Sequence, residues 1–407
     1  MKNFFAGDKA IWYIFILLLS ISLIEVLSAG SYLVMKEGSI TAVMAQQIAF
    51  VLISFAVAWV THKINCYFFQ LLLVLGNVIA IILLFVAFFY GQSINGGARW
   101  IPIGGMTFQP SELAKGMLIV GNATLILKHY VNSRVKPGAF YVASGLSLLI
   151  FVLVFSQNLS TAILIFVFSF SPFLFFRPPL KAVKTVAMWF GGLAVVGLFV
   201  VSILPKDPNA EIYQYSFLQR VSTWRNRVSK DDFVKTENPN DFEITDRNRQ
   251  VVNARIAIAR SHGLGVRPGR SVQRDYLSAA YSDFIYAIIA EELGLAGCIV
   301  VVFLYLFLLY RCLHLAKQSP NRLPAAMILG LSIMMVGQAF VNMAVAVGLG
   351  PVTGQTLPLI SKGGTSAIIT GFYFGLILSC SRDIIKKSGD RQKFIAEVSA
   401  NARTAAQ

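Results

Sequence analysis

Charged residues are scarce in this chain of 407 residues, since Asp, Glu, Lys and Arg together make up 13% of it. That is about half of the share found in typical soluble domains. Hydrophobic residues make up 56%, more than one water-soluble core can bury, so the chain is expected to be an integral membrane protein. In a soluble protein the net charge of +16 would suggest nucleic acid. Here we attribute it to membrane topology and to attraction by anionic membrane lipids, and expect no nucleic acid partner.

Cysteine and histidine are also rare, with four of each. Cys66, Cys298, Cys312 and Cys380 lie in or beside apolar runs and lack the spacing of metal ligands. The histidines are scattered along the chain. These observations argue against a disulfide framework, a zinc site and a His-centred catalytic triad.

Long apolar runs are abundant, and a helix needs roughly 20 apolar residues to cross a bilayer. We therefore predict an all-α, polytopic membrane protein of about ten transmembrane helices. The predicted spans are 11–29, 40–61, 68–90, 112–128, 140–156, 158–176, 183–204, 294–312, 323–349 and 364–381. The first run is too long for a typical signal peptide and is read as a retained helix.

Lysine and arginine in alternate short connections set the orientation. If there are ten spans, the cations of the N-terminal tail, of the alternate connections and of the C-terminal tail all fall on one side. They are Lys2, Lys9, Lys63, Lys128, Arg134, Lys136, Arg177, Lys181, Lys184, Arg311, Lys317, Arg322, Arg382, Lys386, Lys387, Arg391 and Lys393. That side is predicted to be cytoplasmic, with both termini inside. The chain is read as one membrane domain (1–407) with a large outer loop (205–281) between spans seven and eight and a cytoplasmic tail (382–407).

The outer loop contains thirteen Lys or Arg and nine Asp or Glu residues. A basic outer loop suits an anionic substrate such as a phosphorylated lipid. A solvated loop of mixed charge is the alternative interpretation.

Three outer segments contain residues suited to chemistry. In the first, Glu112 and Lys115 follow Pro110 and share one face of a predicted helix. They form either a local ion pair or part of a polar site. In the second, the carboxylate of Asp283 precedes Phe284 and Ile285, a costly arrangement at a lipid boundary unless the acid has a function. We expect 281–293 to form a separate helix or a kinked extension of the next span.

The third segment, 350–366, is rich in glycine, proline and hydroxyl residues. Irregular backbone at membrane depth is tolerated where it lines a cavity. Its N–H groups, together with Lys362, are suited to cradling a diphosphate. Glu25, in the outer third of the first span, is a further candidate, although an ordinary interface position explains it equally well. Gly263–Gly265 follows no strand, so no nucleotide site is predicted.

These segments together resemble the SEDS family of bacterial cell-wall glycosyltransferases over nearly the whole chain. The four matching motifs are Gly97–Ile101, Gln109–Lys115, Asp283–Gly294 and Thr356–Ser366. The resemblance implies polymerisation of lipid II at the outer face of the cytoplasmic (inner) membrane of a bacterium. It implies lipid II and a class B penicillin-binding protein (a transpeptidase) as partners, together with other division proteins. The eighth and ninth spans are expected to offer apolar faces to the partner's single helix.

The resemblance also implies roles for individual residues. Asp283 matches the family's catalytic aspartate. The candidate substrate-binding residues are Trp100, Glu112, Lys115, Arg220, Gln355, Lys362 and Ser366. A divalent cation such as Mg²⁺ is a candidate cofactor, with no ligands assigned. The chain departs from the family at Asn158, where an Asp is usual, and at Lys362, where a Tyr is more usual.

The sequence resembles the division-type members more than the elongation-type members, which stay an alternative. A lipid II flippase is the alternative of another class. It would place ionisable groups or broken helices near the bilayer midplane, whereas the charged residues of this chain gather at the outer rim.

Overall fold

A computed structural model describes residues 4–30, 39–94, 97–103, 106–131, 134–155, 157–174, 176, 178–203, 248–277 and 280–405. Within them, ten helices correspond one for one to the predicted spans. They are α1 (Lys9–Ala29), α3 (Ile40–Lys63), α4 (Phe68–Tyr90), α5 (Pro110–Lys128), α6 (Pro137–Phe155), α7 (Leu159–Ser169), α8 (Leu180–Ile203), α11 (Ile285–Gln318), α12 (Arg322–Ala346) and α13 (Thr365–Ala405). The predicted all-α, polytopic membrane fold is thus confirmed.

Six of these helices are long and apolar enough to cross a bilayer on their own: Lys9–Ala29, Ile40–Lys63, Pro137–Phe155, Ile285–Gln318, Arg322–Ala346 and Thr365–Asp390. Leu75–Tyr90 and Leu159–Leu174 are shorter apolar helical stretches. The last includes the 3₁₀ turn η1 (Ser171–Leu174), which continues α7 toward the predicted end of the sixth span.

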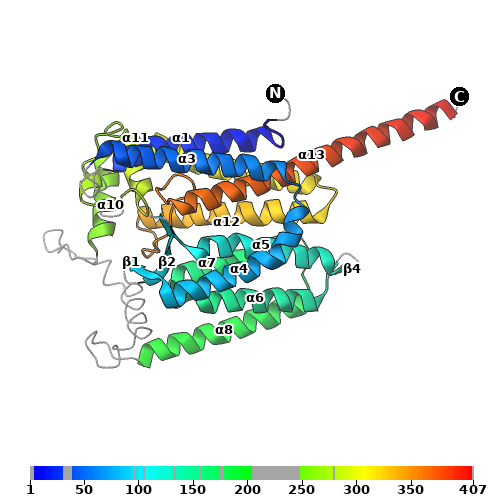
Figure 1. The fold of residues 1–407 in the computed structure, drawn as a ribbon, viewed down its shortest axis with the longest axis horizontal. Coiled ribbons are helices and arrows are strands. Elements are labelled where there is room, and N and C mark those ends of the chain that lie inside the picture. The colour runs from blue at the N-terminus through cyan, green and yellow to red at the C-terminus, as the bar shows by residue number, and fades with distance from the viewer. Residues whose placement is uncertain are drawn as a thin grey trace.

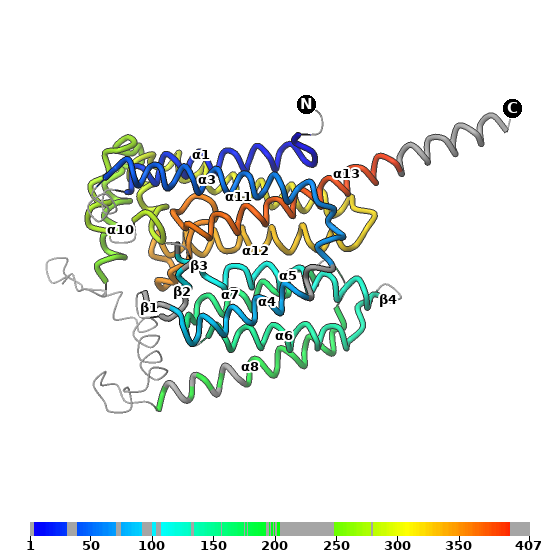
Figure 2. Tube along the Cα trace, in the orientation of Figure 1, coloured from blue at the N-terminus to red at the C-terminus, as the bar shows by residue number. Residues whose placement is uncertain are grey.

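The helices run roughly parallel or antiparallel in one bundle (Figure 1). α12 lies at its centre and packs against α5, α11 and α13, while α8 lies at the edge beside α6 (Figures 1 and 2). Both chain termini and the β4 turn lie at one end, and β1, β2 and α10 lie at the other. The basic connections therefore share one end of the bundle, as the charge pattern predicted. We call it the inner end and the opposite one the outer end.

The connections between the spans contain short strands and helices that the sequence did not predict. The glycine-rich loop forms a small antiparallel sheet of β1 (Gln92–Ile94), β2 (Gly97–Ile103) and β3 (Met106–Phe108). β4 (Tyr130–Val131) and β5 (Arg134–Val135) form a hairpin at the inner end. The described part of the outer loop contains α10 (Arg249–Arg260) and the 3₁₀ turn η5 (Gln273–Asp275). The helix of the last span does not end at residue 381, because α13 continues into the predicted tail.

The segment 285–293 is a kinked extension of the eighth span, one of the two predicted possibilities. The kink is at Gly294, whose φ of 66° and ψ of −157° interrupt the helix. A Cβ at this position would lie 2.5 Å from the carbonyl oxygen of Gly263, so only glycine fits without movement. The kink thereby places the 263–265 turn directly against α11.

Cysteine labelling tests the orientation of the bundle. Leu264 is 92% exposed at the outer end, and Lys136 is exposed at the inner end. In intact cells, an impermeant thiol reagent should label a single-cysteine Leu264→Cys variant but should label Lys136→Cys only after the membrane is opened. The reversed pattern would move every candidate site residue to the cytoplasm.

Candidate active site

The first and third candidate segments meet through a buried chain of polar contacts. The Lys115 ammonium donates to Glu112 Oε1 and to Gln338 Oε1 of α12, each at 2.7 Å. Gln338 Nε2 then donates to the carbonyl oxygen of Thr356 at 3.1 Å. The predicted Glu112–Lys115 pair is therefore present, and it is buried within the bundle.

α13 holds the first turn of α5 from the other side. The buried Tyr373 hydroxyl donates to the carbonyl oxygen of Glu112 at 2.6 Å and accepts from the Gly116 N–H at 3.2 Å. A Cβ on Gly116 would lie 2.1 Å from the tyrosine ring. This close approach fixes the backbone that presents Glu112.

The second and third segments are joined through backbone groups. The Lys362 N–H donates to the Tyr281 carbonyl oxygen at 2.9 Å, and the Ser361 hydroxyl donates to the Ser282 carbonyl oxygen at 2.6 Å. Asn342 Nδ2 of α12 donates to the carbonyl oxygens of Asp283 (2.8 Å) and Gln355 (2.6 Å). The backbones bearing Asp283 and Lys362 are therefore held together at the outer end.

Asp283 is half-buried in the turn before α11. The helix begins at Ile285 with Phe284 at the capping position, so the aspartate lies outside the helix that it was expected to start. Phe284 and Ile285 are fully buried in the protein core. The sequence pattern placed this carboxylate at a lipid boundary, but its two apolar neighbours face protein instead.

The third segment is irregular and largely buried. Gly354 and Leu359 have φ angles of 64° and 65°, a conformation costly for leucine. Gln355 Nε2 donates to Thr161 Oγ1 of α7 at 2.6 Å. Ser366 Oγ lies 3.5 Å from Thr356 Oγ1, and Lys362 is half-buried. The predicted cavity-lining backbone thus packs mainly against α7, α11 and α12.

Several buried polar atoms near Gln355 have no hydrogen-bond partner within the described residues. They include Gln355 Oε1, Asn342 Oδ1, Asn158 Nδ2 and Thr353 Oγ1. Such atoms are costly unless water or a polar ligand satisfies them. Their mixture of donors and acceptors suits uncharged groups such as sugar hydroxyls and acetamido groups.

Three further candidates, Trp100, Arg220 and Glu25, are not part of this network in the described residues. Half-buried Trp100 lies in β2 opposite Gln92, on the sheet that Thr365 contacts through the Thr107 carbonyl oxygen at 2.8 Å. Arg220 lies outside the described residues. Glu25 is fully buried in α1, and both of its carboxylate oxygens lack a hydrogen-bond partner in the described part of the chain.

A second carboxylate pair orders the outer loop rather than joining this network. Glu292 accepts from the Gly269 N–H at 3.0 Å and from the Ser28 hydroxyl of α1. Glu291 accepts from the Ser271 hydroxyl and from the Val272 N–H at 3.1 Å. These bonds tie the loop to the same helical segment that follows Asp283.

Divalent cation ligands are not evident in the described residues, where no group of three or more His, Cys, Asp or Glu side chains lies together. Mg²⁺ is usually held by one or two carboxylates together with substrate phosphates, so this observation assigns no ligand to it. We assign no step to a metal.

Comparison with known proteins gives consistent matches. A family model described as "Cell cycle protein", covering FtsW, RodA and SpoVE, matches residues 8–385. The probable peptidoglycan glycosyltransferase FtsW of Halorhodospira halophila is 31% identical over 308 residues, 74% of this chain and 71% of the relative. That of Haemophilus influenzae is 29% identical over 378 residues, 91% of this chain and 89% of the relative.

Solved structures share the fold. A chain from a study of polymerization and crosslinking by a peptidoglycan synthase complex superimposes with a TM-score of 0.69 at 23% identity, covering 93% of this chain and 98% of that one. The crystal structure of the rod shape determining protein RodA of Thermus thermophilus gives a TM-score of 0.63 at 22% identity, covering 94% and 99%.

Proposed function

The chain belongs to the FtsW/RodA/SpoVE family of cell cycle proteins, and from this premise we propose that it is a peptidoglycan glycosyltransferase. Its substrate is lipid II, which it polymerises into glycan strands at the outer face of the bacterial cytoplasmic membrane during cell division. The observation that carries the proposal is the convergence of three motif-bearing segments, with Asp283 and Lys362 on adjoining backbones at the outer end. The relatives named as FtsW glycosyltransferases support the reaction class.

The reaction forms one bond and breaks another. The 4-hydroxyl oxygen of a GlcNAc attacks the anomeric carbon of a MurNAc, while the bond from that carbon to undecaprenyl diphosphate breaks. Asp283 accepts the hydroxyl proton as a general base. The leaving diphosphate gains negative charge, which Lys362 and Arg220 offset. The unpartnered side-chain atoms around Gln355 are suited to holding sugar substituents.

The buried Glu112–Lys115 pair has a supporting role in this scheme. It is linked to the third segment through Gln338, so it holds the segment that bears Lys362 in place. Trp100, at the edge of the small sheet, is suited to packing against a sugar ring or the lipid.

A polymerisation assay with purified protein in detergent tests the proposed reaction. Glycan polymer should form from lipid II without a sealed membrane, whereas a flippase has no activity that can be scored there. The assay should be run with and without the cognate class B penicillin-binding protein. Absence of polymer under both conditions would contradict the proposal.

Substitutions of Lys362 test its charge role. We expect Lys362→Glu to reduce polymerisation far more than Lys362→Arg, because either cation offsets the diphosphate charge and the carboxylate repels it. Initial rates at several lipid II concentrations provide the measurement. Equal rates in the wild type and both variants would remove Lys362 from the site.

The proposed transpeptidase partner needs an exposed apolar helix face. α11 provides one, with Leu295, Ile299, Phe303, Leu306 and Tyr310 between 47% and 62% exposed. α12, the ninth span, is buried along most of its length, so the expectation that it offers such a face is wrong. The sequence did not distinguish the two cases, because a helix at the centre of the bundle and a helix that faces lipid are both apolar.

Crosslinking locates this partner face. A photoreactive residue at Phe303 should capture the transmembrane helix of the penicillin-binding protein, while the same residue at Phe199 of α8, which is 63% exposed, should not. Equal capture at both positions would argue against a specific face on α11.

A further inference from the structure

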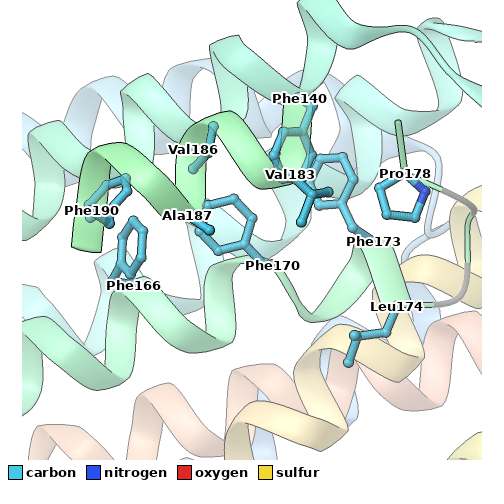
Figure 3. A pocket seen from close by; sticks show the side chains of 10 residues that line it. All are labelled: Phe140, Phe166, Phe170, Phe173, Leu174, Pro178, Val183, Val186, Ala187 and Phe190. Carbon is cyan, nitrogen blue, oxygen red and sulfur yellow. The ribbon is translucent and has the colours of Figure 1, made fainter. Parts of the chain in front are cut away.

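An apolar pocket of about 370 Å³ lies between α6, α8 and the end of α7 with η1 (Figure 3). Its ten lining side chains are all hydrocarbon, and five of them are phenylalanine. A pocket lined in this way does not hold ordered water, because it offers no polar partners. Its natural content is another hydrocarbon.

The shape of the pocket follows from the helix periodicity. Val183, Val186 and Phe190 lie on one face of α8, and Phe166 of α7 and Phe170, just after α7, lie on the facing side (Figure 3). The stretch from Val183 to Phe190 is about 10 Å long at 1.5 Å per residue. The pocket is therefore an elongated slot roughly parallel to the helices.

The slot lies in the inner half of the bundle, away from the candidate active site. Phe140 lies in the first turn of α6, Leu174 ends η1, and Pro178 precedes α8, all close to the inner connections. Leu174 is 76% exposed, so the slot is open to its surroundings there. One leaflet accounts for about 15 Å of a hydrocarbon core of about 30 Å, so a slot of about 10 Å fits within a single leaflet.

Cations lie within a few residues, along the chain, of positions that line the inner end of the slot. Lys181 and Lys184 are exposed in the first turns of α8, and Arg134 and Lys136 are exposed just before α6. The two connections, 128–139 and 175–184, contain no Asp or Glu. The first turn of a helix adds positive potential from its free N–H groups. Basic sites of this kind between helices on the cytoplasmic side attract anionic lipid headgroups.

We propose that this slot binds one acyl chain of an anionic phospholipid from the inner leaflet, with the headgroup phosphate held by Lys181 and Lys184. The apolar slot supplies the binding of the chain, and the lysines select the charge. The lipid would fasten the edge helix α8 to α6 and α7 at the end opposite the active site.

A partner helix fits the slot poorly. A helix is at least 10 Å wide and presents backbone and side chains of mixed shape, whereas an acyl chain is a narrow, uniform hydrocarbon. The lining side chains are hydrocarbon throughout, which matches an acyl chain along its whole length.

Native mass spectrometry of the purified full-length protein tests the proposal. The protein is released from nanodiscs that contain equal amounts of dioleoyl phosphatidylglycerol and dioleoyl phosphatidylethanolamine, and retained lipid is identified. We expect wild-type protein to retain phosphatidylglycerol selectively. Ala187→Trp, which fills the slot, should abolish retention, whereas Val195→Trp on the exposed, non-lining part of α8 should not.

The lysines are tested in the same way. Lys181→Gln with Lys184→Gln should weaken phosphatidylglycerol retention by roughly fivefold for each charge removed. Lys317→Gln with Lys386→Gln, which removes two exposed inner-end charges elsewhere, should leave it unchanged. Equal retention of both phospholipids, or unchanged retention in Ala187→Trp, would overturn the proposal. Preferential retention of added undecaprenyl phosphate would assign the slot to a polyprenyl chain and overturn it as well.

Discussion

Asp283→Asn should leave a protein that inserts and folds but polymerises lipid II at least 10²-fold more slowly, within the 10²–10⁴-fold range typical for loss of a general base. The amide keeps the shape of the side chain but cannot take a proton from the sugar hydroxyl. The Asn342 contact should survive, because it is made to the Asp283 carbonyl oxygen rather than to the side chain. Initial rates of polymer formation by purified protein are the measurement.

Asp275→Asn is the matched control for this substitution. Asp275 lies in η5 of the outer loop, eight residues before Asp283, with an exposed side chain, and its Arg274 contact is long at 3.9 Å. An exposed pair of this kind contributes little to stability. The control should therefore polymerise at nearly the wild-type rate. A near-normal rate in Asp283→Asn would refute the catalytic assignment.

Lys115→Met should destabilise the protein by about 3–5 kcal/mol, the usual cost of leaving one buried charge without its partner. The Lys115 side chain is 2% exposed and the Glu112 side chain 8%, so water cannot replace the lost ammonium. Polymerisation should fall as well, because Gln338 loses the contact that links α5 to the third segment. Thermal unfolding in detergent and polymerisation rate are the two measurements.

A double variant separates charge from shape. Glu112→Gln with Lys115→Met leaves no buried ion and should recover most of the stability lost in Lys115→Met. Its activity should stay low if the pair supports the site. A double variant as unstable as Lys115→Met would show that the cost comes from lost packing instead.

The sequence predicted the features that depend on short spacing. The ten spans could be located from apolar runs, and the Glu112–Lys115 pair from two residues three apart at a helix start. The convergence of the three segments rested on family resemblance. Its structural cause is a set of contacts from Gln338, Asn342 and Tyr373, on helices that read only as apolar spans.

Other features were missed because tertiary packing decides them. The sheet of β1, β2 and β3 was missed because the many glycines in this part of the sequence suggest a loop rather than strands. The burial of Phe284 and Ile285 depends on the protein packed around them, and a hydropathy pattern does not distinguish protein from lipid. One sequence signal could have predicted this network. It is an isolated polar residue within an apolar run, such as Asn342.

The irregular 350–364 segment has a consequence for how the site forms and fails. Its conformation depends on groups far away in the chain: Ile360 accepts from Ser22 of α1, Ser361 donates to Ser282, and Asn342 bridges to the 283 turn. Such a segment cannot acquire its shape until the helices around it have assembled. We expect it to be among the last parts to fold and among the first to open on mild heating, so that catalysis is lost while the helical bundle is still intact.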